Sequence, residues 1–179
     1  MRMSVQFLCI VLLSLVACKK DNEENASASG VLPSSNPNGV SFKANINGIP
    51  YQADSIFAVL NIDTTASFHS RLLGIAGFGT SHIVACGFED TNISTTIPLN
   101  TFNFSVSMPT SFFEYYKIVN PDTLNEFENM DGILTITAND VANQKVSGTF
   151  HVTFLDYVTN DTVKITNGIF SNVPYSINF

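Results

Sequence analysis

The stretch KVSGTFHVTF at residues 145–154 decides the fold class of this chain. Every second position from Val146 to Phe154 is apolar or glycine, and the positions between them carry serine, threonine and histidine. Successive side chains of a β-strand point to opposite faces, so this alternation predicts a strand with one apolar and one polar face. A slip of one residue would expose the whole apolar face, so we expect a tightly defined register.

Similar short runs occur on both sides of this stretch. They cover residues 42–46, 49–53, 55–61, 71–78, 82–88, 102–106, 134–138 and 163–170. Asn47-Gly48 joins the first two runs and favours a two-residue hairpin, because both residues of such a turn adopt positive φ. Residues 111–119 fit either a strand or a short helix. No stretch keeps a helical apolar stripe for three turns, so the sequence predicts an all-β, antiparallel fold of about nine or ten strands, as a sandwich or a barrel-like sheet.

The composition agrees with a folded domain and excludes several classes of protein. The chain has 179 residues, of which 45% are hydrophobic and 13% charged, and it contains 15 phenylalanines. This apolar content is too high for a chain that is disordered throughout. The net charge of −7 argues against a nucleic-acid partner, which requires a basic surface. The length fits a single domain of residues 40–179 with an N-terminal appendage.

Residues 1–17 have the features of a secretory signal peptide. Arg2 supplies the positive start, and residues 5–16 are mainly apolar, which is too short a run to cross a bilayer about 30 Å thick. The end of this segment, Leu15-Val16-Ala17-Cys18, resembles the lipobox of bacterial lipoproteins. That resemblance implies cleavage directly before Cys18 and a diacylglycerol on its sulfur. An ordinary signal peptide followed by a chance cysteine is the alternative.

Residues 18–39 form a predicted flexible tether that starts with charged residues and continues with serine, asparagine, proline and glycine. The charged start, Lys20-Asp21-Asn22-Glu23-Glu24, resembles the surface-export signal of Bacteroidetes lipoproteins, in which acidic residues follow a lysine. A solvated charge run is the alternative. We therefore expect lipid anchoring in the outer membrane, with the domain facing either the periplasm or the cell surface.

The three cysteines leave no internal disulfide in the processed chain. Cys9 lies in the signal peptide and Cys18 is the expected lipid attachment site, so only Cys86 remains in the domain. Cys86 shares one face of a predicted strand with Val84 and Phe88, which favours a buried, inert thiol over a reactive nucleophile.

No spacing of residues typical of a catalytic or metal site is present. The three histidines, His69, His82 and His151, form no His-x-x-x-His pattern, although His69 and His82 flank a glycine-rich strand and could meet across a hairpin. There is no Gly-x-Ser-x-Gly, P-loop or dinucleotide motif. Carboxylates between Glu114 and Asp131 could pair for glycoside hydrolysis, but tryptophan, a common sugar platform, is absent. We predict no enzyme activity, no catalytic residues, no metal and no cofactor.

The best candidate for ligand binding is an aromatic cluster at residues 112–116. Phe112, Phe113, Tyr115 and Tyr116 combine apolar rings with two hydroxyl groups, which suits contact with a carbohydrate or a peptide. The same four residues would also suit core packing. The sequence leaves these two alternatives open.

Several blocks resemble an uncharacterised family of Bacteroidetes lipoproteins. The segment FKANINGIPYQA at residues 42–53 is similar to its opening pattern FxAxINGxxYxA, and residues 132–137, 146–152 and 165–170 are similar to later blocks. The resemblance covers residues 41–179 and implies an envelope location. It implies no activity and no site residues, because the family has no assigned function.

Together these features predict a lipid-anchored envelope lipoprotein that acts as a non-enzymatic binding module. The expected ligand is a glycan, a peptide or a protein, and the domain is expected to be a monomer. The alternative is a structural or accessory envelope lipoprotein without a small-molecule ligand.

Overall fold

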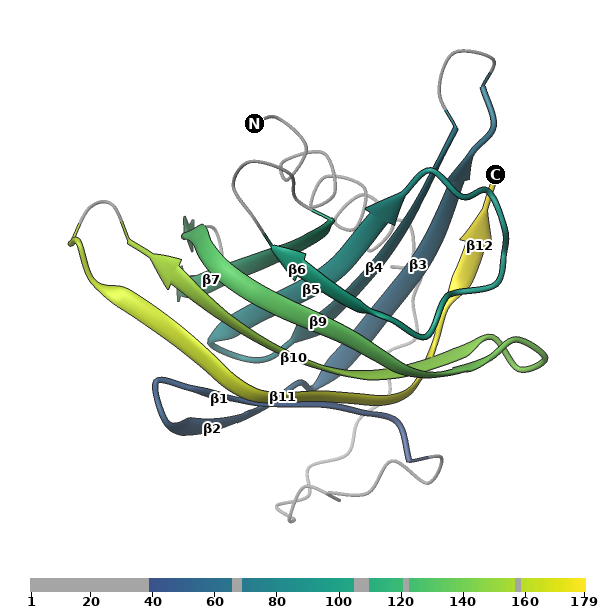
Figure 1. Cartoon of the computed structure of the whole chain (residues 1–179). Coiled ribbons are helices and arrows are strands. Elements are labelled where there is room, and N and C mark those ends of the chain that lie inside the picture. The colour runs from purple at the N-terminus through teal and green to yellow at the C-terminus, as the bar shows by residue number, and fades with distance from the viewer. Residues whose placement is uncertain (1–38, 66–68, 105–109, 121–122, 157–158) are drawn as a thin grey trace. The chain divides into compact units, whose positions relative to one another are not determined.

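The computed structural model describes residues 39–65, 69–104, 110–120, 123–156 and 159–179. These residues contain twelve strands and no helix, and the strands form two six-stranded sheets that pack face to face (Figure 1). The predicted all-β class is therefore confirmed, and of the two predicted architectures the structure has the sandwich. No helix in this described part of the chain is long and apolar enough to cross a membrane.

The two sheets differ in the order of their strands. The first sheet has the order β2 (Ile49–Gln52), β1 (Ser41–Ile46), β11 (Thr162–Pro174), β10 (Lys145–Leu155), β9 (Glu128–Asp140) and β6 (Thr101–Phe104). The second sheet has the order β12 (Ser176–Asn178), β3 (Ser55–Asp63), β4 (Ser70–Phe78), β5 (His82–Asp90), β7 (Ser111–Asn120) and β8 (Thr123–Glu126). The strand count exceeds the expected nine or ten because short edge strands such as β8 and β12 lack a clear alternating pattern.

One short strand pair is parallel in this otherwise antiparallel fold. β12 runs parallel to β3, with Ile177 opposite Leu60. The chain leaves the first sheet at the end of β11 and enters the second sheet as β12 (Figure 1). Tyr175 holds this crossing in place, since its backbone N–H donates to the Gln144 carbonyl at 2.9 Å and its hydroxyl donates to Asn139 Oδ1 at 3.1 Å.

The stretch that decides the fold forms β10 with the predicted faces. Val146, Phe150, Val152 and Phe154 are buried, whereas Thr149 and His151 are exposed. Gly148 continues the buried face, where a Cβ atom would lie 2.3 Å from the Thr135 carbonyl oxygen and 2.4 Å from the Phe170 ring. A glycine is therefore required at this point of close approach between neighbouring strands.

The core between the sheets is rich in phenylalanine. Phe88 of the second sheet stacks on Phe102 of the first, with ring centroids 4.2 Å apart and nearly parallel planes. Phe42 and Phe150 lie side by side in the first sheet, with centroids 5.2 Å apart. Burial of such large rings is the main stabilising contribution to a fold of this kind.

The Asn47-Gly48 turn joins β1 to β2 as the sequence predicts. Both residues have positive φ, 50° at Asn47 and 82° at Gly48, and Ile46 lies opposite Ile49. Asn47 also fixes the hairpin to β11, because its backbone N–H donates to the Lys164 carbonyl and its Oδ1 accepts from the Lys164 N–H, each at 2.8 Å.

Residues 111–119, for which strand and helix were both open, lie in β7. This strand pairs with β5 from Ser111 opposite Phe88 to Lys117 opposite His82. The long ladder supplies backbone partners that an isolated helical turn would lack, so tertiary pairing decides the conformation here.

Candidate functional site

The outer face of the first sheet is polar and open. Its outward side chains come from alternate positions of β1, β2, β9, β10 and β11, and they include Lys43, Asn45, Gln52, Thr135, Thr149, His151, Lys164 and Thr166. This is the solvated face that the alternating pattern predicts for an antiparallel sandwich.

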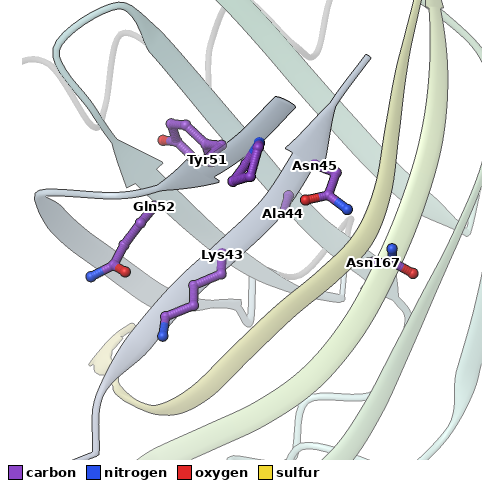
Figure 2. A pocket seen from close by; sticks show the side chains of 7 residues that line it. Lys43, Ala44, Asn45, Tyr51, Gln52 and Asn167 are labelled. Carbon is purple, nitrogen blue, oxygen red and sulfur yellow. The ribbon is translucent and has the colours of Figure 1, made fainter. Parts of the chain in front are cut away.

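A shallow depression of about 270 Å³ lies on this face at the β1–β2 hairpin. It is lined by Lys43, Ala44, Asn45, Pro50, Tyr51, Gln52 and Asn167. The strand register places Lys43 directly opposite Gln52, and Asn45 opposite Pro50. Figure 2 shows Lys43 and Gln52 projecting from the two neighbouring strands, with Asn45 on the side of Asn167 in β11. One cationic and three amide side chains therefore surround the depression.

A β-bulge in β11 brings Asn167 to the depression. Lys43 pairs with Ile169 and Asn45 pairs with Thr166, so Asn167 and Gly168 together oppose Ala44. Asn167 has a φ of 52°, a conformation that asparagine tolerates better than most residues. At Gly168 a Cβ atom would lie 2.6 Å from the Phe150 carbonyl oxygen. Bulges commonly re-aim a side chain in this way.

The polar side chains of this depression are not engaged elsewhere. Lys43, Asn45, Gln52 and Asn167 form no side-chain hydrogen bond or ion pair within the described ranges of the chain. Each amide offers a donor and an acceptor, and the lysine offers three donors. The depression can therefore supply hydrogen bonds and one positive charge to a ligand from solvent.

A second depression, of about 400 Å³, lies on the same face near β6, β9 and β10. Its lining includes Asp131, His151 and Thr153. Asp131 is already engaged, because its Oδ1 accepts a hydrogen bond from the Thr153 N–H at 3.1 Å. The described residues contain no group of three or more histidine, cysteine, aspartate or glutamate side chains that could hold a metal ion.

Tyr51 fastens the hairpin to the second sheet. It lies at the depression, but its hydroxyl donates to the Gly77 carbonyl of β4 at 2.8 Å, so the ring points into the sandwich. Burial raises the pKa of Tyr51, and the charge on Asp54 raises it further. Tyr51 therefore acts as a neutral donor that ties the β1–β2 hairpin to β4.

The His82 ring lies edge-on to the Tyr51 ring, with centroids 6.3 Å apart, and it also contacts Tyr115. The Tyr115 hydroxyl is 3.0 Å from His82 Nδ1, and the two rings stack with centroids 5.6 Å apart. Burial raises the pKa of Tyr115 to about 12. Burial also lowers the pKa of His82, and the neighbouring positive charge of Lys117 lowers it further. Neutral His82 can accept a hydrogen bond from the Tyr115 hydroxyl at Nδ1, whereas protonated His82 has no free lone pair there.

This arrangement predicts an acid-sensitive stability. The pKa of His82 lies below its ordinary value of 6.5 in the folded state, so the unfolded state binds the proton first as the pH falls. The free energy of unfolding should decrease as the pH falls below about 6.5 and level off below the folded-state pKa. Urea denaturation at pH 7 and pH 5 measures this slope. In His82→Gln, which keeps an acceptor but cannot titrate, the slope should be smaller; an unchanged slope would contradict the assignment.

The other histidines lie apart from His82. His69 directly precedes β4, and the β4–β5 ladder runs from Arg71 opposite Asp90 to Phe78 opposite Ile83. His69 is therefore at one end of this hairpin and His82 at the other. The possibility that these two histidines meet across the hairpin was wrong.

The predicted aromatic cluster lies in β7 and is mostly buried. Phe113 and Tyr115 face the core and are 2% and 3% exposed, and the Tyr115 ring packs against Phe127. Tyr116, on the opposite face of the strand, is 3% exposed, and its hydroxyl donates to Glu114 Oε2 at 3.4 Å. Phe112 is half-buried. Three of the four side chains are buried in packing positions, and none of the four lines either depression. The ligand-binding role of Phe112, Phe113, Tyr115 and Tyr116 stays a prediction.

The two remaining cysteine predictions have different outcomes. Cys86 is fully buried in β5, so the prediction of a buried core thiol is confirmed, and burial strongly raises the pKa of this thiol. Cys18 lies outside the described residues, and its lipid attachment stays a prediction.

The four polar residues of the depression are not recognisable as a site from the sequence. Lys43 and Asn45 are the polar positions of an alternating run, which marks them as outward but does not identify their neighbours. Asn167-Gly168 was the only further signal, because this dipeptide favours positive φ. The pairing of β1 with β11, more than a hundred residues away, brings these positions together.

Arg71 is a further residue whose role is not visible in the sequence. It is 1% exposed and forms a two-point ion pair with Asp90. Its Nη1 group donates to the carbonyls of Ser94 at 3.0 Å and Thr96 at 2.6 Å, and its guanidinium lies 5.6 Å from the centre of the Phe88 ring. Because its donors are occupied in this way, Arg71 holds the segment after β5 against the sandwich and is unavailable to a ligand.

Comparisons with known proteins place the chain in a family but assign no activity. No curated protein and no solved structure matches it. One family model matches residues 38–174, which include all strands except β12. The chain therefore belongs to the family described as domain of unknown function DUF6252.

Proposed function

We propose that this protein is a lipid-anchored lipoprotein of the outer membrane of a Bacteroidetes cell, with the DUF6252 domain as a non-enzymatic binding module. The support for the anchor is the lipobox-like end of the signal segment, with Cys18 at the attachment position. The support for the bacterial group is the resemblance of residues 42–53 to the opening block of such lipoproteins.

The binding role rests on one observation, the depression at the β1–β2 hairpin. Four polar side chains, Lys43, Asn45, Gln52 and Asn167, meet there without a partner among the described residues. Some other polar side chains on this sheet are engaged, as in the bonds of Asn47 to Lys164 and of Asp131 to Thr153. A glycan, a peptide or a protein segment that lies across the sheet could use these free groups.

The described residues give an acid–base mechanism little support. The second depression contains one carboxylate, Asp131, which accepts a backbone hydrogen bond, and the first contains none. Glycoside hydrolysis requires two positioned carboxyl groups. Binding is therefore the function that this geometry supports best.

The test is direct binding of the processed, detergent-solubilised protein to arrays of bacterial glycans and of envelope-derived peptides. We expect binding to at least one class of probe, and we expect the Asn45→Ala/Gln52→Ala variant to bind at least about tenfold more weakly, since each lost hydrogen bond contributes about 1 kcal/mol. Thr137→Ala, at an exposed position of β9, is the matched control and should bind normally. If the wild type binds no probe above background, the proposal fails and the structural or accessory role becomes the better account.

A further inference from the structure

Resting on the proposed binding role of the hairpin depression, we infer that its ligand is an acidic saccharide, bound through an anionic group at Lys43 and through hydroxyl groups at the surrounding amides. The inference concerns the chemical class of the ligand. It follows from the charge at the depression, the hydrogen-bonding groups around it and the position of the nearest aromatic ring.

The charge at the depression is opposite to that of the whole protein. The chain has a net charge of −7, yet the lining of the depression contains Lys43 and no acidic residue. Lys164 adds a second exposed cation on the same face, on β11 two positions before Thr166, which pairs with Asn45. Asp131 of β9 pairs with Thr153, which pairs with Lys164, so one strand separates this carboxylate from Lys164, whereas Lys43 lies further along the sheet. The lining itself is therefore positively charged, and the nearest carboxylate whose charge acts on a lining residue is that of Asp54, just beyond Gln52.

The neutral groups match a ligand with many hydroxyls. Asn45 of β1, Gln52 of β2 and Asn167 at the bulge of β11 surround the depression. Each of these amides can donate and accept a hydrogen bond. Saccharide hydroxyls also donate and accept, so they can pair with either end of an amide. Next to the depression, Thr166 of β11 pairs with Asn45 and adds one exposed hydroxyl to this hydrogen-bonding surface.

Stacking on an aromatic ring cannot supply the affinity here. Tyr51 is the one aromatic residue of the lining; the residue is 9% exposed, and its hydroxyl donates to the Gly77 carbonyl across the sandwich. Hydrogen bonds that involve a charged group are roughly twice as strong as neutral ones. A ligand anion at Lys43 is therefore the strongest single contact that this site can make, and a neutral sugar would leave it unused.

The experiment measures binding of the processed protein to three soluble polymers: polygalacturonate, dextran sulfate and neutral dextran. We expect binding to at least one of the two acidic polymers, with a dissociation constant at least about tenfold below that for dextran, which corresponds to about 1.4 kcal/mol. The two acidic polymers distinguish a carboxylate from a sulfate as the anion. Because the pairing is ionic and exposed, affinity should fall as the salt concentration rises from 50 to 500 mM.

Two charge-matched variants separate a local contact from a general charge effect. Lys43→Met should weaken binding of the acidic polymer about tenfold, and Lys43→Arg should retain it. Lys117→Met changes the net charge equally but lies on the second sheet, so it should bind normally. Equal losses in Lys43→Met and Lys117→Met would overturn the inference. Binding of neutral dextran with equal affinity would overturn it while leaving the binding role intact. Binding of none of the three polymers would overturn it alone if the protein binds another probe on the arrays, and would defeat both proposals if it binds none.

Discussion

Under the proposed lipid anchor, Cys18→Ser is expected to move the protein from the membrane fraction to the soluble fraction or to leave it as an unprocessed precursor. The serine hydroxyl cannot form the thioether that carries the acyl chains, and these chains supply the membrane affinity at about 0.8 kcal/mol for each buried CH₂ group. No other apolar run in the sequence approaches the roughly 20 residues that span a bilayer. Fractionation after a carbonate wash measures the distribution.

The rest of the chain cannot replace the lipid electrostatically. Removal of residues 1–17 takes away one basic residue and no acidic residue from a chain of net charge −7, so the processed protein is repelled by anionic lipids. Cys86→Ser is a useful control, because the buried thiol of β5 has no part in anchoring and the variant should remain in the membrane if it folds. Retention of Cys18→Ser in the pellet, or a wild-type N-terminal peptide without lipid by mass spectrometry, would refute the anchor.

The largest loss of stability is expected from Arg71→Met. The change leaves Asp90 without its cation and removes the donors to the carbonyls of Ser94 and Thr96. Removing one partner of a buried ion pair typically costs about 3–5 kcal/mol. Asp90 is 28% exposed and can be hydrated, so we expect a loss of about 3 kcal/mol, at the lower end of that range. Urea denaturation followed by circular dichroism measures it.

Two further variants test whether the ion pair is the cause. In Arg71→Met/Asp90→Asn no unpaired charge remains, so the double variant should lose less stability than the sum of the two single variants. Lys145→Met removes a cation at the start of β10 and should change the free energy of unfolding by less than about 0.5 kcal/mol. A loss in Arg71→Met as small as that in Lys145→Met would show that the Arg71 contacts contribute little.

Local patterns predicted the strands and their faces well. The alternation at residues 145–154 identified which side chains of β10 enter the core, and Asn47-Gly48 identified the β1–β2 turn. Both features depend only on neighbours in the sequence, so they are visible without a structure.

Pairing between distant strands was not predictable in the same way. A period of two assigns a residue to a face but does not name the strand beside it, so the neighbours of Lys43 and Asn45 in the depression were unknown. The same limit applies to the aromatic cluster of Phe112, Phe113, Tyr115 and Tyr116, because such side chains occur in binding surfaces as well as in cores. Arg71 also stands in an apolar run, and its partner Asp90 becomes visible only through the β4–β5 register.

The placement of the last two strands has a consequence for how the chain folds. β1 pairs with β11, and β3 pairs with β12. These two early strands therefore gain these partners only when residues at the far end of the chain have joined the sheets. The β3–β4–β5 meander, in contrast, contains only short-range pairings and can form as soon as it is available. Contacts between distant residues slow folding because loop closure must come first, so we expect folding in milliseconds to seconds rather than microseconds. A chain emerging in order from its N-terminus would hold the hairpin with the candidate site unpaired until β11 arrives, and the site would form among the last parts of the domain.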